Sequence, residues 1–174
     1  RLPWVSGAAE LGAVDNERVG VAGPSFGGGG TAAVITRTQL FRAAVAISGI
    51  FDLPGTYGDI DEAGGAFWVG WSEGGQARMG THPWEAPPRY LENSAYYQAH
   101  KIHTPLLIVH GDEDMAFHDA EKLFSALRRL ARSVQLAVYH GQCHVISSWT
   151  LPNAIDAGER ILDFFHRHLR GEPE

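Results

Sequence analysis

The sequence predicts an α/β domain with a mostly parallel sheet and helices on both faces. Short apolar runs typical of buried strands alternate with helical or irregular crossovers, and this alternation is characteristic of parallel sheets. The chain has 174 residues, of which 44% are hydrophobic and 20% are charged, enough for one domain with a substantial core. We therefore treat residues 1–174 as a single domain with four strands, expected at 18–22, 43–48, 105–111 and 134–139.

The first part of the chain predicts a helix end, a polar turn and a strand. Hydrophobic residues recur three positions apart over 2–11, and Gly12 is a suitable helix stop. Polar residues at 15–17 then form a turn before the strand at 18–22.

A very tight turn follows the first strand. Residues 23–27 read Gly-Pro-Ser-Phe-Gly, and small residues compatible with a helix over 26–37 come next. This order predicts strand, turn and helix with Ser25 at the apex, its hydroxyl exposed above the carboxyl end of the sheet. Glycines on both sides allow the close approach that a strained turn requires. The amide of Phe26, in the first turn of the helix, can face an anion. A glycine-rich turn of an ordinary α/β domain would have the same local sequence.

The segment 49–103 has no clear periodicity and separates the strand at 43–48 from the strand at 105–111. We expect an irregular excursion that forms a pocket wall or lid, with one short helix near 85–91. Its aromatic residues either line a pocket or simply pack the excursion down. They are Phe51, Tyr57, Phe67, Trp68, Trp71, Trp84, Tyr90, Tyr96 and Tyr97.

Regular patterns return after residue 103. The continuous apolar run at 105–111 is typical of a strand buried on both faces. Amphipathic spacing predicts a helix over 121–130 and a C-terminal helix over 155–169, with the strand 134–139 and a loop at 140–148 between them. Gly171 is expected to end the last helix, and 172–174 to form a tail.

Composition excludes several classes of function. The net charge of −6, with no basic stripe, argues against a nucleic-acid partner, and no apolar run reaches the length of a membrane span. The single cysteine, Cys143, rules out an internal disulfide and leaves the cellular compartment open.

Reactive residues follow three of the expected strands. Ser25 follows the first, the acidic run Asp112 to Asp114 follows the third, and His144 lies in the loop after the fourth. The carboxyl ends of parallel strands share one edge of a sheet, where ligands bind. Serine, aspartate and histidine in this chain order match the triad of the α/β-hydrolase fold. A serine hydroxyl needs a base to take its proton, and imidazole serves near neutral pH when a carboxylate fixes its tautomer.

Longer blocks around these residues carry a family resemblance. Residues 23–28 read Gly-Pro-Ser-Phe-Gly-Gly, and 38–45 read Thr-Gln-Leu-Phe-Arg-Ala-Ala-Val. Further blocks are Pro-Trp-Glu-Ala-Pro-Pro-Arg-Tyr at 83–90, Thr-Pro-Leu-Leu-Ile-Val-His-Gly-Asp-Glu-Asp at 104–114, and Val-Tyr-His-Gly-Gln-Cys-His at 138–144. Together they resemble the prolyl oligopeptidase family of serine peptidases, and most of all its acylaminoacyl-peptidase-like branch. The likeness extends over essentially the whole chain.

The resemblance implies an α/β-hydrolase fold with Ser25 as nucleophile, Asp114 as orienting acid and His144 as base. Asp112 and Glu113 are rival acids, although Asp114 occupies the family position in His-Gly-x-x-Asp. Where the family usually has tyrosine after the serine, this chain has Phe26, whose backbone amide supplies half of an oxyanion hole. A cysteine mechanism through Cys143 is disfavoured, because adjacent loop side chains normally point in different directions.

Catalytic domains of this family begin with further strands, and an early loop carries the second oxyanion donor. Both would precede residue 1, so we expect the C-terminal part of a hydrolase domain. An exposed sheet edge invites aggregation unless it is covered. The expected partners are therefore a peptide substrate and either the missing N-terminal portion or a second copy of the chain.

Three functions remain open at this point. The first is a serine peptidase acting on short peptides through an acyl-enzyme, with Phe67, Trp68 and Trp71 lining an apolar pocket for the residue before the cleaved bond. The second is a carboxylesterase with the same triad, and the third is a non-catalytic fragment or binding module. No cofactor or metal is expected. His166 and His168 lie near an exposed helix end, and His140 and His144 lie on a loop with no nearby cluster of carboxylates.

Overall fold

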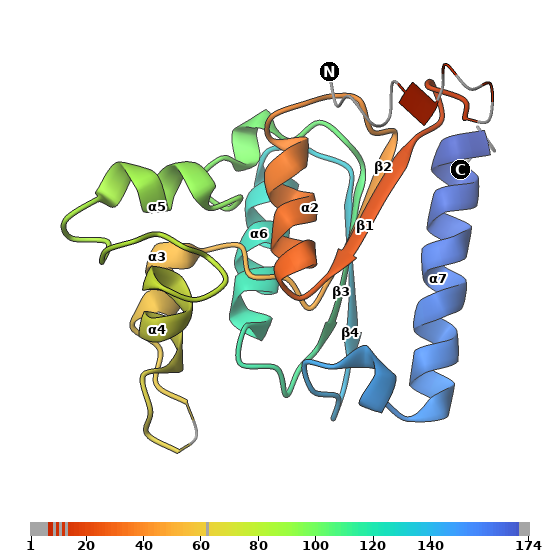
Figure 1. The fold of residues 1–174 in the computed structure, drawn as a ribbon. Helices are drawn as coiled ribbons and strands as arrows, with labels where there is room; N and C mark the ends of the chain where they lie inside the picture. Colours follow the sequence, from red (N-terminus) through yellow and green to blue (C-terminus); the bar gives the residue numbers. More distant parts are fainter. Residues whose placement is uncertain (1–6, 9, 11, 13, 62, 171–174) are drawn as a thin grey trace.

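The sheet has four parallel strands, as predicted (Figure 1). A computed structural model describes residues 7, 8, 10, 12, 14–61 and 63–170. The strands lie in the order β1-β2-β3-β4. In the register of the sheet, Ala46 of the second strand lies beside Ile108 of the third, and Ile108 lies beside Leu136 of the fourth. Their bounds are β1 Gly20–Pro24, β2 Ala43–Ile47, β3 Leu106–Gly111 and β4 Val134–Tyr139.

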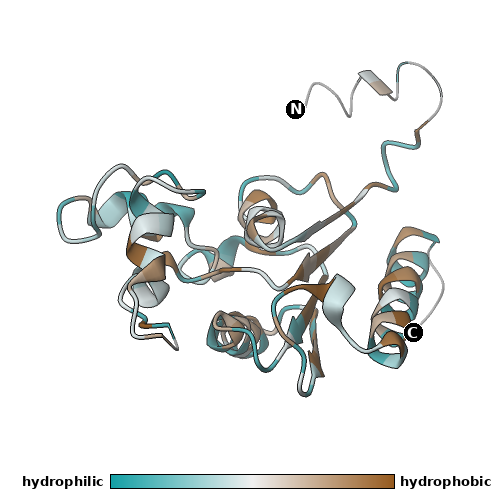
Figure 2. Ribbon diagram, turned by 60° about the horizontal axis from the view of Figure 1, so that its bottom comes forward, coloured by the Kyte–Doolittle hydropathy of each residue, from teal (hydrophilic) through white to brown (hydrophobic). Residues whose placement is uncertain are grey.

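Helices cover both faces of this sheet. The helices α2 (Phe26–Ile35) and α6 (Phe117–Arg129) lie on one face, and α7 (Leu151–Arg170) lies on the other (Figure 1). Alternate residues of β2 and β3 supply the two cores, since successive strand side chains point to opposite faces. Figure 2 shows the apolar strands between helices on both sides, with hydrophilic residues on part of the α7 surface. One core contains Ala44, Ala46, Leu106, Ile108, Leu123 and Leu127, and the other contains Ala43, Val45, Leu107, Val109, Ala157 and Phe164.

The segment 49–103 is more regular than its sequence predicts. It forms the helices α3 (Leu53–Tyr57), α4 (Phe67–Glu73) and α5 (Pro87–Asn93) and a 3₁₀ turn at Ala99–Lys101. Only α5 was expected, near 85–91. Helices of five to seven residues are unstable alone, and tertiary contacts sustain them here. Their own cluster of buried side chains consists of Ile50, Leu53, Tyr57, Trp68, Met79, Tyr90 and Ala116.

A buried carboxylate ties this segment to α6. Asp119 Oδ2 accepts hydrogen bonds from the amides of Phe51 and Asp52 at 3.0 and 2.9 Å and from Thr56 Oγ1 at 2.9 Å. Burial raises the pKa of Asp119, although these donors act in the opposite direction. Lys122, which lies 3.5 Å from Asp119 and 3.0 Å from Asp52, supplies the compensating charge.

Other helix boundaries differ from the predictions by a few residues. Helix α6 begins at Phe117 rather than 121, and α7 begins at Leu151 rather than 155. Most of the helix predicted over 2–11 lies outside the described residues, as does the expected end at 171–174, while residues 7, 8 and 10 are helical. Within the described part of the chain, no helix is both long and apolar enough to cross a membrane.

Two glycines of α2 are expected to respond oppositely to alanine. A Cβ on Gly28 would lie 2.6 Å from the Ile47 carbonyl oxygen, whereas a Cβ on Gly30 would meet nothing within 4 Å. Gly28→Ala should therefore lower the free energy of unfolding by about 1–3 kcal/mol. Gly30→Ala should raise it by about 0.5–1 kcal/mol through helix propensity. Urea midpoints of the two variants test this, and equal stabilities would contradict it.

Candidate active site

The turn that carries Ser25 has the strained geometry that its sequence predicts. Ser25 has φ 56° and ψ −123°, a backbone conformation that residues with a side chain rarely adopt. Its amide donates to the Ile47 carbonyl oxygen at 2.8 Å. Gly23 has no room for a side chain, because a Cβ there would lie 2.4 Å from the Gly27 carbonyl oxygen. Strand β1 and helix α2 therefore meet closely around the serine, and the first amides of α2 are left without intrahelical acceptors.

The structure brings Ser25, His144 and Asp114 into one hydrogen-bonded chain. His144 Nε2 lies 2.8 Å from Ser25 Oγ, and His144 Nδ1 lies 2.7 Å from Asp114 Oδ2. An ionised carboxylate only accepts hydrogen bonds, so Nδ1 carries the proton and Nε2 is free to accept from the serine hydroxyl. The amide of Ala116 donates to Asp114 Oδ1 at 3.0 Å and fixes the carboxyl plane.

The surroundings of the pair Asp114 and His144 favour a charged carboxylate. Burial alone would raise the pKa of Asp114, but contacts with His110, His144 and the Ala116 amide hold it well below its usual range. The hydrogen bond to Asp114 raises the pKa of His144 above its ordinary value of 6.5, and burial opposes this effect. His144 is thereby a stronger base than a free imidazole.

The rival acid Asp112 has other partners. Asp112 pairs with His140, whose Nδ1 lies 2.7 Å from Oδ2, and its Oδ1 accepts from the Gly141 amide at 2.7 Å. His140 and His144 therefore each contact one aspartate, and each contact is with a different aspartate. No group of three or more potential ligands in the described part of the chain is arranged to hold a metal ion.

The loop that carries His144 is docked on the loop that carries Asp114. Gly111 lies against the loop that carries His144, and a Cβ on Gly111 would lie 2.1 Å from the Gln142 carbonyl oxygen. The Glu113 amide donates to the same oxygen at 3.0 Å. The Cys143 carbonyl accepts from Trp149 Nε1 at 2.7 Å, while its thiol lies 3.2 Å from Ser148 Oγ. These contacts fix the position of the imidazole.

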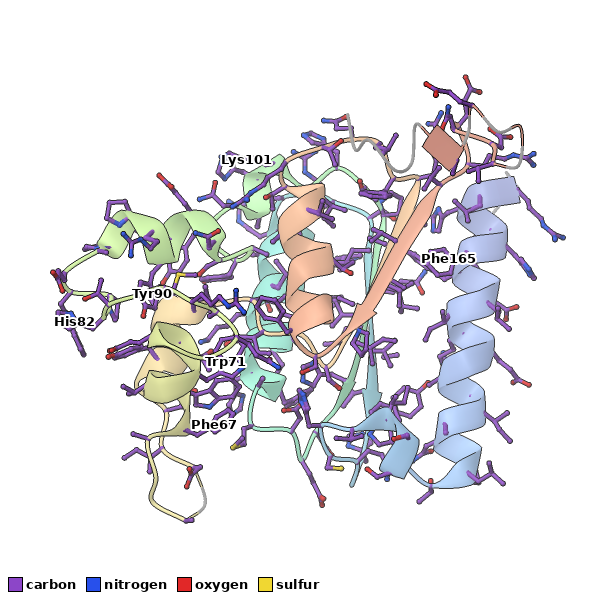
Figure 3. All side chains as sticks on the ribbon, viewed as in Figure 1. Phe67, Trp71, His82, Tyr90, Lys101 and Phe165 are labelled. Atoms are coloured by element: carbon purple, nitrogen blue, oxygen red, sulfur yellow. The ribbon has the colours of Figure 1, made fainter. Side chains whose placement is uncertain are left out.

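An apolar cavity of about 690 Å³ opens beside Ser25 and His144. Phe67 and Trp71 extend from α4 towards the rest of the domain (Figure 3), and Phe67 is about half exposed. Trp68 also lines the cavity but is only 4% exposed, so most of its ring packs in the core of the 49–103 segment. The Phe26 ring contacts Trp71 edge to face, with centroids 6.1 Å apart.

Comparison with known proteins identifies the family. The model of the prolyl oligopeptidase family matches residues 2–172. The chain belongs to the prolyl oligopeptidase family. Among curated relatives, the "Uncharacterized peptidase YuxL" of Bacillus subtilis is 29% identical over 159 residues, which cover 90% of this chain and 23% of that protein.

Solved structures of similar fold include other peptidases. An acylaminoacyl peptidase of Pyrococcus horikoshii superposes with a TM-score of 0.79 at 23% identity, covering 95% of this chain and 26% of that one. A puromycin-hydrolyzing peptidase of Mycobacterium tuberculosis gives a TM-score of 0.81 at 23% identity, covering 95% and 24%. The predicted α/β-hydrolase fold is confirmed. The chain spans about a quarter of the length of these prolyl oligopeptidase relatives.

One side chain beside the site was not singled out from the sequence. His110 is fully buried at the end of β3, with Nε2 2.9 Å from Asp114 Oδ2. The available signal was a titratable residue ending an otherwise continuous apolar strand, at the first position of the motif His-Gly-x-x-Asp.

Proposed function

We propose that this chain carries the catalytic triad of a serine peptidase that cleaves short peptides through an acyl-enzyme intermediate. Ser25 is the nucleophile, His144 the general base and Asp114 the orienting acid. The observation that carries this proposal is the continuous chain of contacts of 2.8 and 2.7 Å from serine to imidazole to carboxylate. Catalytic bases must lie within such hydrogen-bond reach of the proton that they remove.

The proposed reaction has two stages. Ser25 Oγ attacks the scissile carbonyl carbon while His144 Nε2 takes the hydroxyl proton, and Asp114 stabilises the resulting imidazolium. The Phe26 amide donates to the developing oxyanion. Nε2 then protonates the departing amine, which leaves an ester between Ser25 and the acyl group. Water, deprotonated by the same nitrogen, hydrolyses this ester and restores the serine.

The cavity supports a preference for an apolar residue before the cleaved bond. Phe67, Trp71 and Met115 line it, and burying a large apolar side chain against such groups is favourable by about 1.5–3 kcal/mol. We propose that Phe67, Trp68 and Trp71 make this substrate pocket.

Two further functions are separated by experiment. The same triad serves a carboxylesterase, so turnover of an aminoacyl anilide is compared with turnover of a short acyl ester. A non-catalytic module is tested with an organophosphonate that reacts with activated serines. We expect the native chain to be labelled and Ser25→Ala to resist labelling. A native chain that is not labelled would overturn the proposed function.

The rate should depend on pH through His144. The imidazole must be neutral to accept the serine proton, so kcat/KM should increase with pH through the pKa of His144. Hydrogen bonding to Asp114 raises that pKa, so the midpoint should lie above 6.5. Asp114 stays ionised throughout, because its pKa is held low. Measuring ester hydrolysis from about pH 5 to pH 9 tests this, and a midpoint clearly below 6.5 would contradict it.

We also propose that another part of the protein, or a second copy of the chain, covers the outer edge of β1. That strand lies at one end of the sheet order, and in the described part of the chain no strand pairs with its outer edge. Unpaired edges promote association. Size-exclusion chromatography of the 174-residue chain should show dimers or larger species. A well-behaved, active monomer would contradict this proposal.

A further inference from the structure

His110 is a titratable side chain beside Asp114 that has no role in the proposed triad. It is fully buried at the end of β3, and its Nε2 lies 2.9 Å from Asp114 Oδ2. The same oxygen lies 2.7 Å from His144 Nδ1. One carboxylate oxygen therefore contacts two imidazoles, one that reaches Ser25 and one enclosed in the core.

Stability alone gives no reason for an imidazole at this position. Neither ring nitrogen of His110 forms a geometrically complete hydrogen bond with the described residues, although Nε2 lies 2.9 Å from Asp114 Oδ2. Burying a polar group without such bonds costs about 1–3 kcal/mol. The ring packs against Phe117 with centroids 6.0 Å apart, in surroundings that an apolar side chain could also fill. What an apolar side chain could not supply is the polar contact with Asp114.

We propose that His110 is a positioning residue, which limits through Asp114 Oδ2 how strongly that carboxylate holds the Nδ1 proton of His144. This inference rests on the proposed function of the triad. At 2.9 Å, a ring nitrogen that bears a proton attracts the carboxylate, whereas a bare lone pair would repel it. A carboxylate whose charge is already stabilised by one nearby N–H dipole binds a hydrogen-bond donor on its other side less tightly. Without His110, Asp114 would hold the His144 proton more tightly and stabilise the imidazolium more strongly.

Other groups face Asp114 and His144 from neighbouring elements. Ser25 and the Ala116 amide are neutral, whereas the Cys143 thiol titrates and interacts electrostatically with Asp114. Cys143 is therefore replaced by serine in every protein that the experiment compares, so that no change in the charge of the thiol affects Asp114 or His144.

The experiment follows the His144 ring protons by NMR during a pH titration, together with the pH profile of p-nitrophenyl acetate hydrolysis. His110→Phe and the smaller His110→Leu should both move the His144 midpoint to higher pH, by about 0.5–1 unit. His110→Asn keeps an N–H donor, so its His144 midpoint should lie closer to that of the parent. His118→Phe is the matched control, because His118 is 84% exposed and pairs with Glu121, and it should not move the midpoint.

The outcomes separate this inference from the proposed function. An unchanged midpoint in a folded apolar variant would overturn the role of His110. A shift to lower pH would also overturn it, because that is the effect of a loosened contact between Asp114 and His144. If His110→Phe does not fold, His110→Leu decides. If the parent chain hydrolyses nothing but the apolar variants still raise the His144 midpoint relative to the parent, the proposed function is refuted, and the effect of His110 on the Asp114–His144 contact stands.

Discussion

Replacing Ser25 by alanine is expected to reduce kcat for an aminoacyl anilide by about 10⁶-fold, because the proposed acyl-enzyme forms on this hydroxyl. His144→Ala should have a similar effect, since Ser25 Oγ would lose the proposed base, which lies 2.8 Å away. In the proposed mechanism both side chains act in one step, so the double variant should be little slower than either single variant. Single-turnover and steady-state rates of the three variants provide the measurement.

These variants should remain folded, which makes the comparison interpretable. Ser25 makes its structural contacts through the backbone, including the amide bond to Ile47. Circular dichroism and urea midpoints serve as controls. Additive losses in the double variant would contradict a shared step, and unchanged turnover in His144→Ala would remove His144 from the mechanism.

Asp114→Asn is expected to reduce kcat by about 10⁴-fold with a smaller effect on KM. Asparagine can present an amide N–H instead of an acceptor to His144 Nδ1, which favours the wrong tautomer. Asp112→Asn is the matched control, because the Asp112 carboxylate pairs with His140 and the Gly141 amide rather than with His144. The decrease in kcat caused by Asp112→Asn should be far smaller than the decrease caused by Asp114→Asn. Full activity of Asp114→Asn would transfer the acid role to Asp112 or Glu113.

The sequence predicted the parts of the fold that local pattern determines. Each strand is a short apolar run, and the flanking glycines predict the tight turn at Ser25. The helices α3 and α4 were missed because neither has enough residues for a periodic signal. They are held instead by distant partners, notably Asp119 on α6, which binds the backbone of residues 51 and 52. Such contacts have no signature in the local sequence.

The topology of the sheet made part of the proposed site predictable. Parallel strands bring their carboxyl ends together, so chain order alone could assign Ser25, the acidic run at 112–114 and His144 to one edge. Within that run, the choice of Asp114 came from the family resemblance. The pairing of His140 with Asp112 depends on how one loop docks on another, and it was not foreseen. The contact of His110 with Asp114 depends on the direction of the His110 side chain at the end of β3, which the sequence does not specify.

The strands that precede Ser25 and His144 lie at opposite ends of the sheet, and the two residues are 119 positions apart in the chain. A nascent polypeptide therefore displays its serine long before the ribosome has made the imidazole that would activate it. If the proposed mechanism holds, Ser25 stays unactivated in the growing chain until β4 and the loop that carries His144 have emerged and docked. Covalent labelling of the serine during refolding would then record the arrival of that final strand, because such long-range pairing forms late.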